Sequence, residues 1–186
     1  MSSVRGGGDV RAYVGMGSNL GDRAGNLLAG VRGMLAANLG VARLSSVYET
    51  EPVGVEDEQP AFLNMAAELC APLPPPEELL RLLLDIERDA GRRRERPLAP
   101  RTLDLDLLLY GEERLETDAL TLPHPRLHRR RFVLAPLAEL IPEARHPILG
   151  ASFAELLAAV GDDSRVELWD AGRWAAFPLP LRRGLL

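Results

Sequence analysis

One run of seven residues, 104–110, limits the fold more than any other part of the chain. It reads DLDLLLY, and in it Asp104 and Asp106 alternate with leucines. Successive side chains of a β-strand point to opposite faces, so both aspartates share one face while Leu105 and Leu107 share the other. The pattern predicts a strand whose leucine face packs on a core and whose aspartate face opens into a common polar space.

Apolar periodicity elsewhere predicts strands and helices in a defined order. The expected strands are 10–16, 41–50, 61–69 and 104–110, and the expected helices are 23–38, 77–90, 132–140 and 153–160. Up to residue 110 this is the βαββαβ order of a ferredoxin-like α+β sandwich. We expect an added hairpin through Gly111 and a second hairpin over 166–177, within a C-terminal extension.

The length of 186 residues suits one domain with a substantial core. We expect a flexible tail over 1–9, one domain over 10–161 and the extension over 162–186. No run approaches the roughly 20 apolar residues that cross a bilayer, and the first residues lack the apolar stretch of a secretory signal. Cys70 is the single cysteine, which excludes an internal disulfide and fits a reducing cytoplasm.

Charge is distributed unevenly along the chain. The net charge of −5 argues against a general nucleic-acid binder. All 22 basic residues are arginine, and ten of them fall within 88–101 and 126–131. An acidic protein with two local arginine clusters is typical of one that binds a discrete anionic ligand. We expect small-molecule partners, no nucleic acid, no membrane, and a monomer or weak homo-oligomer.

The aspartate pair is a candidate metal site. Like charges this close repel unless a cation lies between them or one is protonated. Two carboxylates suit Mg²⁺, which binds few protein groups and completes its octahedron with water and phosphate oxygens. The alternative is a solvated face on an edge strand. The leucine-rich flanks and the neighbouring Arg101 favour the metal site.

Arginines surround the start of this strand. Guanidinium groups match phosphate oxygens and keep their charge near neutral pH. The cluster therefore predicts a nucleoside triphosphate bound with Mg²⁺, although any single member could belong to a solvated basic loop. Its members are Arg92, Arg93, Arg94, Arg96 and Arg101.

His124 begins a second basic segment, in which it lies between two prolines and is followed by four arginines. The segment leads into a predicted helix, and helix starts bind anions. Either a phosphate contact or a structural role fits His124.

Two further stretches support a site without defining one. The loop GMGSNLGDR lacks the spacing of a phosphate-binding P-loop, so we interpret it as a tight strand-to-helix turn in which Ser18, Asn19 or Asp22 caps the helix. Phe62 and Asn64 share one strand face, where a ring and an amide could hold a flat heterocycle. Core packing for Phe62 and a satisfied buried amide for Asn64 are the simpler alternatives.

Together these stretches resemble the 6-hydroxymethyl-7,8-dihydropterin pyrophosphokinase family of folate biosynthesis. The matches follow the family's order from residue 12 to residue 140. They are AYVGMGSNLGDR, SSVYETEPVG, QPAFLNMAAEL, the helix end Ile86-Glu87 with Gly91-Arg92, PRTLDLDLLLY and LPHPRLHRRRFVLAPL. The combination of PRTLDLD with PHPRLHxRxFVLxPL is the specific part of the resemblance.

The resemblance implies transfer of the β,γ-pyrophosphoryl group of ATP to the hydroxymethyl oxygen of the pterin, with release of AMP. It implies two Mg²⁺ ions on Asp104 and Asp106, and catalytic roles for Arg92 and Arg101, with Arg92 on a loop that closes over the site. The implied ATP contacts are Glu87, Arg92, Arg94, Arg101, Leu107, Thr121, His124 and Arg130. The implied pterin contacts are Thr50, Val53, Gly54, Phe62, Asn64, Asp104 and Phe132.

Three features depart from the family's pattern. Leu98 leads into Ala99-Pro100-Arg101 where a tryptophan is frequent, Phe62 stands where tyrosine is common, and the arginine loop is slightly shorter. The missing tryptophan favours an alternative, a pterin- or nucleotide-binding module that has lost catalysis. A different two-metal nucleotidyl transferase is a further alternative, but it leaves the PHPRLH segment without a role.

Overall fold

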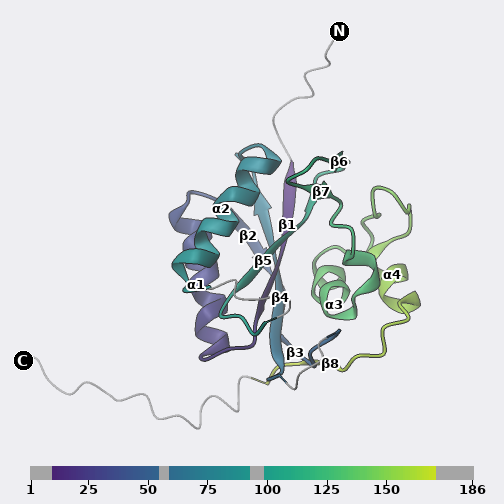
Figure 1. Ribbon diagram of the computed structural model, residues 1–186. Coiled ribbons are helices and arrows are strands. Elements are labelled where there is room, and N and C mark those ends of the chain that lie inside the picture. The colour runs from purple at the N-terminus through teal and green to yellow at the C-terminus, as the bar shows by residue number, and fades with distance from the viewer. Residues whose placement is uncertain (1–9, 55–58, 93–98, 171–186) are drawn as a thin grey trace, which may run out of the picture.

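An antiparallel sheet with helices on both sides forms the part of the chain that the computed structural model describes, residues 10–54, 59–92 and 99–170 (Figure 1). The strands are β1 (Arg11–Ser18), β2 (Gly40–Leu44), β3 (Tyr48–Thr50), β4 (Phe62–Cys70), β5 (Asp104–Tyr110), β6 (Leu115–Glu116), β7 (Thr121–Leu122) and β8 (Val166–Leu168). The helices are α1 (Arg23–Ala36), α2 (Pro76–Asp89), α3 (Arg131–Leu140) and α4 (Phe153–Ala159), with a 3₁₀ turn at Leu127–Arg129. Helices α1 and α2 lie on one side of the sheet, and α3 and α4 on the other (Figure 1).

The main sheet has the strand order β5-β1-β4-β3-β8, and β2 also pairs with β4. Its pairings are antiparallel throughout the described residues. The register between β1 and β5 sets Gly17 opposite Asp104 and Gly15 opposite Asp106. This arrangement confirms an α+β fold and places the aspartate strand at one edge of the sheet.

The sheet separates two apolar clusters. One lies under α1 and α2 and contains Val14, Leu105 and Leu107, each at most 2% exposed. The other lies under α3 and α4 and contains Leu108, Leu134 and other apolar residues. The predicted alternation in β5 is confirmed, because its leucines at 105 and 107 face the α1–α2 cluster while both aspartates face the opposite side.

The single strand expected over 41–50 is wrong. The chain forms two strands instead, with β2 pairing with the C-terminal half of β4 and β3 with its N-terminal half. Ser45 lies in the break, where its backbone N–H donates to the Ala66 oxygen and its Oγ accepts from the Ala66 N–H. The side-chain hydroxyl thus replaces one ladder bond, which alternating hydrophobicity does not reveal.

The expected hairpin through Gly111 is also wrong in its pairing. After the turn at Gly111, β6 pairs with β7 and not with β5, so the added hairpin begins one strand later. In the C-terminal extension, β8 pairs with β3, and residues 171–177 of the expected hairpin lie outside the described residues. No helix of the described residues has the length and apolar character to cross a membrane.

Candidate active site

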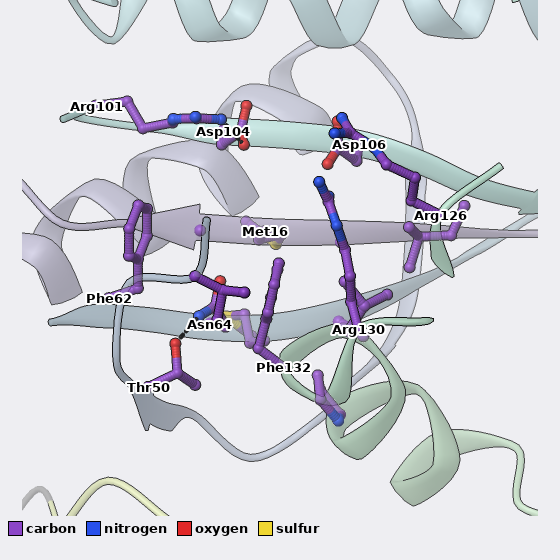
Figure 2. Close-up of a pocket in the computed structure, with 18 of the residues that line it drawn as sticks. Met16, Thr50, Phe62, Asn64, Arg101, Asp104, Asp106, Arg126, Arg130 and Phe132 are labelled. Atoms are coloured by element: carbon purple, nitrogen blue, oxygen red, sulfur yellow. Dashed lines mark hydrogen bonds and ion pairs between the residues drawn. The ribbon is translucent and has the colours of Figure 1, made fainter. Parts of the chain in front are cut away.

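A cavity of about 710 Å³ opens between the sheet and the start of α3. Asp104 and Asp106 project into it from β5, and Phe132 and Arg130 project into it from the α3 side (Figure 2). Phe62 and Asn64 enter from β4, and Thr50, Val53 and Gly54 come from β3 and the loop that follows it. The cavity therefore joins a charged half next to β5 to a half lined by rings and an amide.

Asp104 is held by two arginines. Its Oδ1 lies 2.7 Å from a terminal nitrogen of Arg92, and its Oδ2 lies 2.5 Å from a terminal nitrogen of Arg101. The three side chains are each about one-fifth exposed or less. Both carboxylate oxygens are therefore occupied, and the charge of Asp104 is neutralised from two directions.

Glu87 of α2 bonds to Arg92 and to the backbone of β5 next to Asp104. It is 2% exposed, forms an ion pair with Arg92, and its Oε1 accepts the backbone N–H of Leu105 at 2.7 Å. The backbone N–H of Arg92 also donates to the backbone oxygen of Glu87, at 3.1 Å. Burial raises the pKa of Glu87, although the Leu105 N–H and Arg92 oppose that rise. Glu87 thus orients Arg92 and the start of β5.

Asp106 has different surroundings. Its side chain forms no ion pair or hydrogen bond with any other residue that the structure describes. Burial, and then the charge of Asp104, raise the pKa of Asp106 to about 6. A half-buried carboxylate with open oxygens beside a second carboxylate is a group that a divalent cation would stabilise.

Arg126 and Arg130 extend toward Asp106 (Figure 2). Neither forms an ion pair within the described part of the chain. Arg130 also lies over the Phe132 ring, with its guanidinium carbon 5.5 Å from the ring centroid. Two guanidinium groups that extend into a cavity are suited to phosphate oxygens.

His124 lies near Arg126 and Arg130 and stays neutral. Burial, then the charges of Arg130 and Arg126, lower the pKa of His124 to about 4. Its Nδ1 accepts the backbone N–H of Arg126 at 3.3 Å, so the proton of the neutral ring is on Nε2. Nε2 is left as a hydrogen-bond donor.

Two aromatic rings and an amide line the other half of the cavity. The rings of Phe62 and Phe132 lie on either side of the Asn64 amide (Figure 2). Asn64 is 6% exposed, and its Nδ2 donates to Thr50 Oγ1 at 2.7 Å. A Cβ at Gly17 would lie 2.8 Å from Asn64 Oδ1, so the glycine leaves room for the amide.

The loop after β1 fixes the other end of the site. Asp22 is the N-cap of α1 and accepts the Gly25 N–H, which settles the choice among the three capping candidates. Asn19 instead holds the segment before β5, because its backbone N–H and its Oδ1 both bond to the backbone of Arg101, at 3.1 and 2.8 Å. The glycine-rich turn thus positions an arginine of the site.

Most of the residues expected in the site do line the cavity. They are Thr50, Val53, Gly54, Phe62, Asn64, Arg92, Arg101, Asp104, Asp106, Arg130 and Phe132. Four others lie outside the cavity lining: Glu87, which pairs with Arg92, His124, which accepts the Arg126 N–H, Leu107 with its side chain in the core, and Thr121 in β7. Arg94 and Leu98 lie outside the described residues. Sequence reasoning missed Glu51 and Arg126 as lining residues, although Arg126 belonged to a recognised arginine cluster.

The family model for 7,8-dihydro-6-hydroxymethylpterin-pyrophosphokinase (HPPK) matches residues 13–142, a span that contains every residue lining the cavity. The chain belongs to this family. Within the HPPK match lie both aspartates of β5 and all four arginines of the cavity. The expectation drawn from the sequence motifs is therefore confirmed at the level of the family.

Relatives and solved structures agree with the HPPK assignment. The 2-amino-4-hydroxy-6-hydroxymethyldihydropteridine pyrophosphokinase of Bacillus subtilis is 45% identical over 159 residues, which cover 85% of this chain and 89% of that protein. The protein of the same name from Synechocystis is 42% identical over 150 residues, covering 80% and 75%. A structure of Plasmodium falciparum HPPK-DHPS with pteroate matches with a TM-score of 0.64 at 15% identity, over 83% of this chain and 43% of that longer chain. At that identity the structural match shows the fold alone.

Proposed function

We propose that this chain transfers the pyrophosphoryl group of ATP to the hydroxyl of 6-hydroxymethyl-7,8-dihydropterin and releases AMP, as a step of folate biosynthesis. The pterin oxygen would bond to the β-phosphorus while the bond from that phosphorus to the bridging oxygen of AMP breaks, and the hydroxyl proton would leave to solvent. Membership of the HPPK family supports this reaction. The observation that carries it is one cavity lined by two aspartates, four arginines, two aromatic rings and an amide.

Asp104 and Asp106 fit a magnesium site. Both carboxylates face the same space, and the open oxygens of Asp106 are the hard, anionic donors that Mg²⁺ prefers. We propose two ions there, whose chemistry when bound is to neutralise triphosphate charge and polarise the reacting oxygens. The fixed position of Asp104 between Arg92 and Arg101 supplies one carboxylate already oriented.

The arginines divide between two tasks. Arg92 and Arg101 lie beside Asp104 and would stabilise charge on the migrating group. Arg130 and Arg126 are directed at the cavity near Asp106 and would hold ATP phosphates. His124 would add a neutral donor through Nε2, and Glu87 would act by orienting Arg92. Backbone at Leu107, Thr121 of β7 and Arg94 complete the proposed ATP contacts.

The pterin would occupy the half lined by the rings of Phe62 and Phe132. Stacking between two aromatic rings suits a flat heterocycle. Asn64 and the backbone from Thr50 to Gly54 would form hydrogen bonds with its edges, and Asp104 would lie next to the hydroxymethyl group. Positioning both substrates in one closed space is the main contribution that such a transfer requires of a protein.

The fold class, the domain bounds, the location and the partners of the chain are also proposals. The strand order β5-β1-β4-β3, with β2 beside β3 on β4, supports a ferredoxin-like class. We propose residues 10–161 as the pyrophosphokinase domain, 1–9 as a flexible tail and 162–186 as an extension, in a cytoplasmic monomer or weak homo-oligomer. The partners would be ATP and the pterin.

The test is a product assay with ATP, Mg²⁺ and the hydroxymethyl-dihydropterin. We expect AMP and the pterin diphosphate in equal amounts, and no product when Mg²⁺ is removed with a chelator. Release of ADP or free pyrophosphate would contradict the proposed transfer. Binding of both substrates without AMP would identify the chain as a binding module.

A further inference from the structure

The segment 162–169 follows α4 and contacts both walls of the proposed pterin site. One wall is β3 with the loop after it, and the other is the start of α3. Its strand β8 pairs with β3, with Tyr48 opposite Leu168 and Thr50 opposite Val166. The Trp169 N–H extends this ladder by donating to the Val47 oxygen at 2.8 Å. The segment is thus a strand neighbour of the element that carries Thr50.

Glu51 anchors the loop that follows β3. Its backbone N–H donates to the Arg165 oxygen at 3.3 Å, and its Oε1 accepts the Arg165 N–H at 2.8 Å. Glu51 also lines the cavity, between Thr50 and the loop residues Val53 and Gly54. The backbone from Thr50 to Gly54 is proposed to bond to the edge of the pterin. Arg165 therefore fixes this segment through Glu51.

Asp162 anchors the opposite wall. No side chain caps α3 from within its own N-terminal turn, but the Arg131 N–H donates to Asp162 Oδ2 at 2.8 Å. The other oxygen of Asp162 accepts the Ser164 N–H at 3.0 Å, which fixes the carboxylate. A carboxylate at this end satisfies an orphan donor and complements the helix dipole. Phe132 is the next residue along this first turn.

The two walls are also joined at their far end. Glu139 of α3 accepts the Ser46 N–H at 2.9 Å and the Tyr48 hydroxyl at 2.8 Å. That contact fixes the C-terminal half of α3 against β3 without help from residues 162–169. The N-terminal turn of α3, which carries Phe132, has its contact with the C-terminal segment instead.

We infer that the segment 162–169 is a positioning element for the pterin acceptor: Asp162 fixes the wall that carries Phe132, and Arg165 fixes the wall that carries Thr50 to Gly54, through Glu51. This inference rests on the proposed function. It assigns Asp162 and Glu51 a larger effect on the pterin than on ATP, because Glu51 lies beside Thr50, Val53 and Gly54, and Asp162 bonds to the residue that precedes Phe132.

The experiment compares full-length wild type with Asp162→Ala, Asp162→Asn and Ser152→Ala. Ser152 is the N-cap of α4, so Ser152→Ala removes a helix cap of similar kind away from the cavity. Steady-state rates of AMP formation give KM for each substrate, equilibrium titration of the pterin's own fluorescence gives its affinity, and thermal unfolding gives stability.

We expect Asp162→Ala to raise the pterin KM and dissociation constant about five-fold, as loss of a cap-sized interaction would. The ATP KM and kcat should stay within about two-fold, and Asp162→Asn should recover most of the loss because its amide oxygen still accepts. Ser152→Ala should lower Tm similarly and leave the pterin KM unchanged. Glu51→Ala should reproduce the pterin effect, and Glu51→Gln should recover it.

Two outcomes would overturn the inference. One is an Asp162→Ala variant that loses stability like Ser152→Ala with an unchanged pterin KM; the other is an equal rise in the KM of both substrates. Failure of the proposed function is distinguishable, because wild type would then produce no AMP. The fluorescence titration would still decide whether Asp162 affects pterin binding.

Discussion

Asp104 and Asp106 stand two residues apart on the same face of β5, and their surroundings are opposite. Arg92 and Arg101 occupy both oxygens of Asp104, whereas the side chain of Asp106 bonds to no other described residue. Burial and the charge of Asp104 raise the pKa of Asp106 to about 6. One carboxylate is thus fixed by the protein, and the other is left to be stabilised by what the site binds.

The two aspartates also differ in their neighbours on the adjacent strand β1. Opposite Asp104, Gly17 leaves space for the Asn64 amide, while opposite Asp106, Gly15 faces the side chain of Leu108. The position of Asp104 is therefore linked to the proposed pterin end of the cavity. Asp106 instead faces Arg126 and Arg130 at the proposed phosphate end (Figure 2). One strand serves two substrates because two successive outward positions meet different neighbours.

The largest effect on the rate of AMP formation should come from neutralising either aspartate of β5. We expect Asp104→Asn and Asp106→Asn each to reduce AMP formation about 10³-fold or more, since several kcal/mol of charge stabilisation would be lost. Their stabilities should differ. Asp104→Asn should lower the free energy of unfolding by about 1 kcal/mol or more because Arg92 and Arg101 each lose one ion pair, and Asp106→Asn should leave it unchanged or raised.

Urea unfolding and the AMP assay measure both quantities on the same samples. Asp106→Asn with more than a tenth of the wild-type rate would contradict the metal role. Equal stabilities of the two variants would break the comparison between the aspartates.

Arg92→Ala should give the next largest effect. We expect kcat to fall about 10²- to 10³-fold, somewhat below the contribution of an arginine in related phosphoryl transfers, because Arg101 would remain beside Asp104. The KM values should change much less. Arg92→Lys keeps the charge without the forked geometry and should recover only part of the rate. A variant with wild-type kcat would refute the catalytic role of Arg92.

Gly17→Ala tests the link between Asp104 and the pterin half. The new methyl would lie 2.8 Å from Asn64 Oδ1, so the amide must move, and we expect the pterin KM to rise about ten-fold. Gly15→Ala is the matched control, because the three atoms nearest to its methyl would all belong to the side chain of Leu108, the first at 3.3 Å. Steady-state kinetics with each substrate varied would show the difference, and identical effects of the two variants would contradict it.

The smallest effect concerns the charges of Arg126 and Arg130 on His124. Burial and these arginines lower the pKa of His124 from 6.5 to about 4, so between these values the unfolded chain binds the proton and the folded chain does not. The contribution of His124 to the free energy of unfolding should therefore rise as the pH increases from about 4 to 6.5, and it should be lost as the pH falls through that range. Unfolding at several pH values should show a shallower slope for His124→Gln than for wild type.

An NMR titration sharpens this last prediction. Arg126→Ala and Arg130→Ala should each move the His124 pKa upward, whereas Arg101→Ala, whose charge is already paired with Asp104, should move it less. A His124 pKa near 6.5 in the wild type would contradict the charge pattern described for this end of the cavity.

Sequence reasoning succeeded where the signal was local or belonged to a family motif. The alternation in 104–110 and the starts of the helices were predicted correctly, and eleven of the expected site residues line the cavity. It was wrong about 41–50, where the Ser45 hydroxyl interrupts the strand, and about the partner of the segment after Gly111. These errors share a cause, because a strand's partner is chosen by residues far away in the chain.

The sequence by itself determined which face of β5 is apolar, which residue types gather near the aspartates, and to which family the chain belongs. Only the tertiary structure decided that Arg92 and Arg101 pair with Asp104 and not with Asp106, that Asn19 holds Arg101, and that Asp162 bonds to the start of α3. The physical reason is range. Side-chain periodicity depends on the backbone geometry of adjacent residues, whereas these contacts join segments brought together by folding of the whole sheet.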